Sequence, residues 1–173
     1  GITLQPAAVS EGDPVANVTG DIVALKKGVK VFPAGCTSAT CAVEWDGETE
    51  LELSQMVVNF KLMEGVTWSD GEPLTAEDSV YSFTVSNDPA TAVTKTNSER
   101  TLSYAALDAS TVQWTGQPGY LTLNPSAFFW SPLPQHQLGE LSAEQLNSDA
   151  LTNETPLGWG AYRVDEWVKG DHI

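Results

Sequence analysis

The sequence is poor in cations, histidine and cysteine, and each shortage argues against a class of function. Only 8 Lys and Arg stand against 23 Asp and Glu in 173 residues, which gives a formal net charge of -15. Nucleic acid is a poor partner because binding its phosphates requires clustered cations, and anionic membrane surfaces are disfavoured for the same reason. No run reaches the roughly 18 apolar residues that a membrane-spanning helix needs.

The two cysteines, Cys36 and Cys41, are spaced C-x4-C. A metal site would need two further ligands, and the two histidines, His136 and His172, are far away in the sequence. We therefore expect no metal and no cofactor. We interpret the cysteine pair as a disulfide that closes a surface loop, which implies an oxidising compartment outside the cytoplasm. Two free thiols are the alternative.

Hydrophobic patterning predicts an α+β fold in a single domain over residues 1–173. Strands are expected at residues 21–32 (one bent strand or two short ones), 41–45, 51–63, 101–107, 111–115 and 161–168. Leu51–Met63 is the clearest, because its apolar residues alternate as on a half-buried strand. Helices are expected from Thr75 to the Asp88-Pro89 dipeptide, after Asn124, and from Ser142 onward. Residues 1–20 are punctuated by Pro, Gly and Asn, so we expect them to be irregular.

These elements predict one antiparallel sheet of about five to seven strands, with two or three helices packed on one face. A hydrophobic content of 41% is consistent with a globular core.

The stretch before the first long helix carries the most specific local signals. Asp70-Gly71 predicts a turn, and Thr75 with Asp78 predicts a capping box. Trp68 and Phe83 are expected to pack between the helix and the sheet, and Ala76, Val80 and Phe83 to form the apolar face of the helix.

No catalytic motif is present. The sequence has no G-x-S-x-G, H-E-x-x-H or phosphate-binding loop pattern. His136 is interpreted as a surface residue at a helix start. A carboxylate pair of the glycosidase type stays open as an alternative, since nothing marks one pair among 23 acidic residues. We therefore expect that this protein is not an enzyme.

The sequence contains 6 tryptophans. Exposed aromatic rings stack on sugars, so a secreted carbohydrate-binding module is an alternative function. The other interpretation is that the tryptophans fill the core, where each buries a large apolar area.

Four segments carry a resemblance to a known family. They are residues 60–83 (FKLMEGVTWSDGEPLTAEDSVYSF), 108–112 (DASTV), 132–136 (PLPQH) and 156–167 (PLGWGAYRVDEW). In this order they resemble the bacterial extracellular solute-binding proteins of family 5, the peptide-, dipeptide- and nickel-binding subunits of ABC importers. The sequence departs from the family pattern at Met63, Ser79 and Ala161.

The resemblance implies a two-lobed binding-protein fold, in which this chain would be the inserted subdomain of the first lobe and the start of the return strand. It implies capture of a peptide or other small solute, delivery to an ABC permease, and dependence on the remaining lobes of the parent chain. The implied location is periplasmic or at the cell surface, and a lipid anchor upstream of Gly1 is compatible with it. Gly158 and Gly160 are expected to allow a tight entry into the last strand, which carries Tyr162. No residue is assigned to ligand contact.

Overall fold

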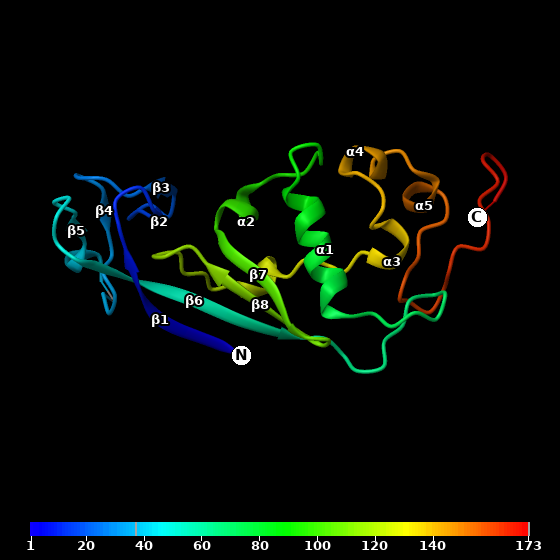
Figure 1. Ribbon diagram of the computed structural model, residues 1–173, viewed down its shortest axis with the longest axis horizontal. Helices are drawn as coiled ribbons and strands as arrows, with labels where there is room; N and C mark the ends of the chain where they lie inside the picture. Colours follow the sequence, from blue (N-terminus) through cyan, green and yellow to red (C-terminus); the bar gives the residue numbers. More distant parts are fainter. Residues whose placement is uncertain (37, 173) are drawn as a thin grey trace. The chain divides into compact units, whose positions relative to one another are not determined.

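The computed structural model describes residues 1–36 and 38–172 (Figure 1). The chain forms two compact units, each assembled from separate stretches. The first consists of Gly1–Phe60, Thr96–Tyr104 and Gln113–Phe128, and the second of Lys61–Lys95, Ala105–Val112 and Phe129–Ile173. The single domain expected over residues 1–173 stays a prediction.

The main sheet has four strands in the order β1-β6-β8-β7. They are β1 (Ile2–Val9), β6 (Leu51–Lys61), β7 (Thr101–Asp108) and β8 (Thr111–Gly116). β1 runs antiparallel to β6, with Ile2 opposite Val58 and Val9 opposite Leu51. The sequence-based expectation of a long strand at residues 51–63 and of a β7–β8 hairpin is confirmed.

Two small sheets accompany it in the first unit. β2 (Pro14–Ala16) pairs with β3 (Ile22–Ala24), and β4 (Lys30–Val31) pairs with β5 (Val43–Glu44). Residues 21–32, expected to form one bent strand or two short ones, form the two short strands β3 and β4, and Gly28 turns the chain between them at a φ of 91°. Together with the main sheet they enclose a core of Val9, Val15, Leu25, Val31, Trp45, Leu51 and Leu53.

A second group of buried rings in the first unit surrounds Trp114 on β8. Its ring is fully buried and stacks on Phe128, with centroids 4.4 Å apart. Its indole N–H donates to the Thr101 hydroxyl at 2.8 Å, so the ring is buried without losing a hydrogen bond. Phe128 ends the short 3₁₀ helix η2 (Pro125–Phe128), which confirms the helical turn expected after Asn124; α2 (Thr96–Glu99) also belongs to this unit.

The second unit contains α1 (Ala76–Asn87), α3 (Gln135–Leu138), α4 (Ala143–Leu146) and α5 (Ala150–Asn153). α1 begins after Thr75 and is followed by Asp88, as expected. The helix expected from Ser142 is two short helices, because the Asp149 side chain accepts the Leu151 N–H at 2.8 Å and caps a new start.

The buried face of α1 differs from the expected apolar one. The buried residues are Ala76, Asp78, Ser79 and Ser82, whereas Val80 and Phe83 are only partly buried. Small side chains let neighbouring backbone approach this face, and the hydroxyl of Ser79 donates to the carbonyl oxygen of Trp130. Ala76 lies on the buried face as expected, and that face is otherwise shifted around the helix toward the small polar residues Ser79 and Ser82.

The expectation of irregular structure at residues 1–20 is wrong. β1 and β2 lie in this range. The partner of β1 is β6, which is far away in the sequence. The Pro, Gly and Asn residues within positions 1–20 therefore could not indicate the pairing. Pro6 is tolerated because β1 is an edge strand, where a missing N–H costs no ladder hydrogen bond.

The strand expected at residues 161–168 is also absent from the structure, which describes all of these residues. Only an isolated bridge joins Val168 to His172. A strand needs a neighbour for its backbone hydrogen bonds, and the described residues supply none along this stretch.

The α+β class is confirmed, with the strands divided over three sheets among the described residues. In the same residues, every helix is too short or too polar to cross a membrane.

Replacing Gly119 by Ala should destabilise the first unit. Its φ is 84°, and an added Cβ would lie 3.0 Å from the Ala16 carbonyl oxygen. We expect a loss of about 1–3 kcal/mol from the strained backbone and the clash. Gly12→Ala is the matched control, since its φ is 92° but no described atom lies within 4 Å of its Cβ. Urea denaturation of both variants would separate the two effects, and an equal loss in both would contradict the clash.

Candidate functional site

The Asp78 carboxyl group is the centre of the second unit. It is 5% exposed at the third position of α1. One oxygen accepts the Thr75 N–H at 2.9 Å and the Trp68 indole N–H at 3.2 Å, and the other accepts the Gln135 N–H at 3.1 Å. The backbone carbonyl of Asp78 accepts the Leu133 N–H at 3.2 Å. One residue therefore joins the helix start, the preceding loop and the segment that leads into α3.

Local sequence explains why α1 starts here. Thr75 has an extended backbone, and the capping box formed by Thr75 and Asp78 is present. Glu77 and Asp78 place acidic groups in the first turn, where the helix dipole favours them. Ala76 is fully buried, and its N–H donates to the Ala109 carbonyl at 2.9 Å.

The turn before the helix is held by hydrogen bonds among its own residues, Trp68 to Glu72. The Trp68 N–H donates to the Glu72 carbonyl at 2.8 Å, and the Asp70 carboxylate accepts the Glu72 N–H at 3.1 Å. Gly71 has a φ of 98°, which only glycine adopts at little cost. The Asp70-Gly71 turn expected from the sequence is therefore in place.

Aromatic side chains surround this turn. Trp68 is 2% exposed and meets the Trp159 ring edge-on, with centroids 5.2 Å apart. His136, in the first turn of α3, lies with its Nε2 2.8 Å from an Asp70 oxygen. It is partly exposed and bonded to a side chain distant in the sequence, which the pattern around residue 136 did not indicate. Phe83 contacts Trp130 edge-on at 4.7 Å.

The last resemblance segment reaches the same turn. The Gly158 carbonyl accepts the Ser69 N–H at 2.8 Å. A Cβ at Gly160 would meet no described atom within 4 Å, and the tight entry expected at Gly158 and Gly160 stays a prediction. Tyr162 is 93% exposed. The four resemblance segments thus meet around the start of α1. Their contacts hold the second unit together. The segments are 60–83, 108–112, 132–136 and 156–167.

The contact between Asp70 and His136 changes the pKa of the Asp70 carboxyl group. The hydrogen bond with His136 and the Glu72 N–H lower the pKa of Asp70 below the ordinary aspartate value. Because the folded pKa is the lower one, the stabilisation is complete above the pKa of unfolded aspartate and is lost as the pH falls through the folded value.

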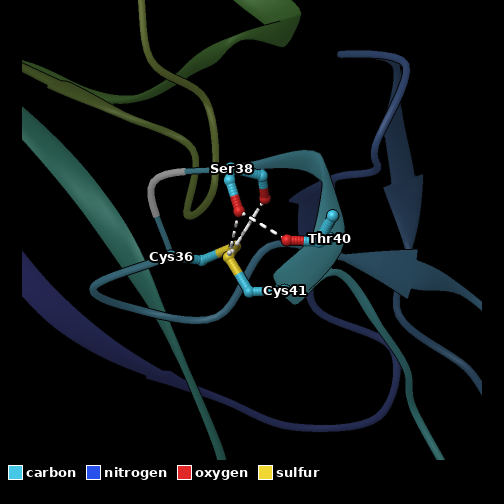
Figure 2. Close-up of a disulfide and its surroundings, with 4 residues drawn as sticks. All are labelled: Cys36, Ser38, Thr40 and Cys41. Carbon is cyan, nitrogen blue, oxygen red and sulfur yellow. Dashed lines mark hydrogen bonds between the residues drawn. A yellow bond between two sulfur atoms is a disulfide. The ribbon is translucent and has the colours of Figure 1, made fainter.

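The Cys36–Cys41 disulfide lies in the first unit, with Cα atoms 5.7 Å apart (Figure 2). It closes the loop that contains η1 (Ala39–Cys41). The Ser38 carbonyl oxygen lies 3.3 Å from Cys36 Sγ and 3.0 Å from Cys41 Sγ. Disulfide sulfurs carry no hydrogen, so these are sulfur–oxygen contacts and not hydrogen bonds.

Two clefts in the first unit were not anticipated from the sequence. One, of about 940 Å³, is lined by Trp45 and by acidic side chains that include Glu44, Asp46 and Glu52. The Thr49 hydroxyl and the N–H groups of Thr49 and Glu48 lower the pKa of Asp46 to about 2. The second cleft has a volume of about 670 Å³. Its lining includes Cys36 of the disulfide and Tyr120. Neither cleft is lined by Asp78 or by the residues that donate to its carboxyl group, Thr75, Trp68 and Gln135.

No group of three or more metal-ligating side chains occurs in residues 1–36 and 38–172. Three of the tryptophans, Trp45, Trp68 and Trp114, are less than a tenth exposed. These three rings are core residues, whereas Trp159 and Trp167 are 46% and 40% exposed.

Solved structures show the class of fold. The oligopeptide-binding protein AppA of Bacillus subtilis, solved with a nonapeptide, has a TM-score of 0.56 and 24% identity over 66% of this chain and 23% of its own. NikZ of Campylobacter jejuni, solved with Ni(L-His), has a TM-score of 0.54 and 27% identity over 66% of this chain and 22% of its own. The fold is that of part of a two-lobed periplasmic binding protein.

The family is defined by sequence. Residues 48–173 match the family model of the bacterial extracellular solute-binding proteins, family 5, middle region, and the chain belongs to this family. A putative ABC transporter peptide-binding protein of Brucella ovis is 26% identical over 135 residues, or 72% of this chain and 24% of that protein. The chain therefore spans about a quarter of the length of the relatives it matches. The family consists of solute-binding proteins and not of enzymes.

Asp78→Asn should destabilise the second unit by about 2–3 kcal/mol, because an amide leaves a buried N–H donor facing another donor. Glu77→Gln removes a charge from the same helical turn at an exposed position and should cost less than about 1 kcal/mol. Chemical denaturation followed by near-ultraviolet circular dichroism would measure both. Equal losses would show that only the helix dipole is involved.

His136→Ala should raise the pKa of Asp70 toward the ordinary value, because the main group that lowers it is removed. Carboxyl resonances followed through an NMR pH titration would report the change. His172→Ala is the control and should leave the pKa of Asp70 unchanged. An Asp70 pKa that stays low without His136 would rule out the contact.

Proposed function

We propose that this chain is part of the substrate-binding component of an ABC importer. That component captures a peptide or similar small solute outside the cytoplasmic membrane and delivers it to the permease. The observation that carries the proposal is the family match over residues 48–173. Two of the signature segments, 60–83 and 132–136, meet at the buried carboxylate of Asp78. Neither the chain nor the parent protein is an enzyme in this proposal.

The described part of the chain is proposed to be a scaffold and not the ligand site. Trp68, Asp70 and Asp78 are occupied by contacts within the second unit. The relatives whose names or structure titles mention a peptide or Ni(L-His) are about four times as long as the region that matches this chain. We therefore place the ligand against the parts of the parent protein outside this chain, as in binders that close two lobes on a ligand.

We also propose that residues 161–168 form the return strand of the first lobe once a neighbouring strand is present. Their large side chains are exposed: Tyr162 at 93%, Trp167 at 40% and Val168 at 40%. Exposed aromatic and branched side chains beside unpaired backbone indicate a segment that is buried in a longer protein.

An extracytoplasmic location fits the disulfide. Cys36 and Cys41 are partly buried near the surface, and disulfides persist where thiols are not kept reduced. The proposed location is the periplasm or the cell surface, which is also the location that the family description implies.

Titration calorimetry with a nonapeptide tests the assignment. The complete parent protein should bind with micromolar or tighter affinity, and the 173-residue chain should show no binding in the same range. Asp78→Asn in the parent protein should reduce stability more than affinity, because the residue packs and does not touch ligand. Micromolar binding by the chain alone would overturn the scaffold assignment. A parent protein that binds neither peptides nor metal–histidine complexes would overturn the transport assignment.

A further inference from the structure

A third cleft of the first unit is lined by basic and apolar side chains. Its volume is about 320 Å³, and its lining includes Lys26, Lys30, Asn17 and three valines. In the described part of the chain no Asp or Glu lines it, although the sequence has 23 acidic residues. The larger cleft beside Trp45 has the opposite character, since acidic side chains line it. Charge of each sign is therefore confined to its own cleft in this unit.

The apolar wall of the third cleft is fixed to the core. Val23 and Val29 are partly buried and pack against the hydrophobic cluster of the first unit. The Val18 N–H donates to the Lys30 carbonyl at 3.1 Å, which ties the turn between β2 and β3 to β4. The Val29 N–H donates to the Lys26 carbonyl at 3.0 Å. The backbones that carry both lysines are thus held beside the valine wall.

Asn17 contributes a donor whose orientation is fixed. Its side-chain oxygen accepts the Thr19 N–H at 2.9 Å, the Thr19 hydroxyl at 2.7 Å and the Asp21 N–H at 3.0 Å. Because these three donors hold the oxygen, the amide group has only its nitrogen, a donor, left to offer to the cleft. The polar groups that the cleft presents from its side chains are therefore all donors.

The two lysines of the cleft have no acidic partner. Across residues 1–36 and 38–172, neither Lys26 nor Lys30 forms an ion pair. Glu44 lies opposite Lys30 in the ladder of β4 and β5 and still does not pair with it. Elsewhere a lysine does pair, as Lys169 does with Glu154 at 2.7 Å. A cleft lined by one sign of charge concentrates ions of the opposite sign, so its counter-ion is an external anion.

We propose that this cleft binds a short aliphatic carboxylate. The carboxylate accepts hydrogen bonds from the ammonium groups of Lys26 and Lys30 and from the Asn17 amide nitrogen. The alkyl group lies against Val23 and Val29, because an inorganic anion would leave that apolar wall in water. A volume of about 320 Å³ lies at the lower end of ligand pockets, which favours a small free acid over a peptide end.

The site is complete within one short stretch of the chain. Every lining residue lies between Asn17 and Lys30, in the first unit, so neither a second copy nor another segment has to supply a ligand group. Exposed ion pairs contribute little each, so the expected Kd is on the order of 1–10 mM. This inference does not depend on the proposed transport function.

A titration of the 173-residue chain with isovalerate, to about 50 mM and followed by two-dimensional NMR, tests the site. We expect saturable shifts at the Asn17 side-chain amide and at the methyl groups of Val23 and Val29. Isovaleramide has the same shape without the charge and should bind at least about 10-fold more weakly. N-acetylvaline carries its carboxylate on a bulkier, peptide-like group and should also bind more weakly than isovalerate.

Single lysine substitutions provide matched variants. Lys26→Gln and Lys30→Gln should each weaken isovalerate binding about 3- to 5-fold, since each removes one ammonium group from the site. Lys27→Gln is the control, because Lys27 is exposed on the same turn and does not line the cleft. It removes the same charge from the chain and should change the Kd by less than about 1.5-fold at physiological salt.

The complete parent protein extends the test. Saturation-transfer NMR should detect isovalerate on it, with a weaker signal after Lys30→Gln. Shifts that do not saturate, equal binding of isovaleramide, or a Lys27→Gln effect as large as that of Lys26→Gln would overturn the proposal. Tighter binding of N-acetylvaline would overturn the choice of a free acid. Binding by the 173-residue chain but not by the parent protein would also overturn it, because another part of the parent would then fill the cleft.

Discussion

A buried carboxylate that accepts only N–H groups holds the second unit together. Asp78 meets Thr75, Trp68 and Gln135 with its side chain, and each donor comes from a different segment. Burying a carboxyl group is costly unless its oxygens are hydrogen-bonded, so these three segments must be in place together. The geometry of the turn, the helix start and the approach to α3 all follow from that requirement.

The same constraint explains why the most distinctive stretch of the sequence is not reactive. Carboxyl, indole and imidazole groups gather around residues 68–78, and in an enzyme such a group would suggest acid–base chemistry. Here the indole N–H and the carboxyl oxygens bond one another, and His136 bonds Asp70 at the rim. Polar side chains that satisfy one another form a rigid joint, which is what a scaffold region of a solute receptor needs.

Signals that act within a few residues were reliable for this chain. The Asp70-Gly71 turn, the capping box, the alternation in β6 and the hairpin could all be recognised from sequence, because each depends on neighbours along the chain. Pairing over long separations could not. β1 is a strand because β6 lies beside it, and residues 161–168 are not one because the described chain offers them no partner. The buried face of α1 was missed for a related reason, since Ser79 and Ser82 are buried by segments that approach closely.

The sequence by itself determined the family, the α+β class and the start of α1, because these depend on local chemistry. Only the tertiary structure decided that Asp78 is shared by three segments and that His136 meets Asp70. The physical reason is that a hydrogen bond between distant segments depends on where the whole chain places its two atoms. No short stretch of residues contains that information.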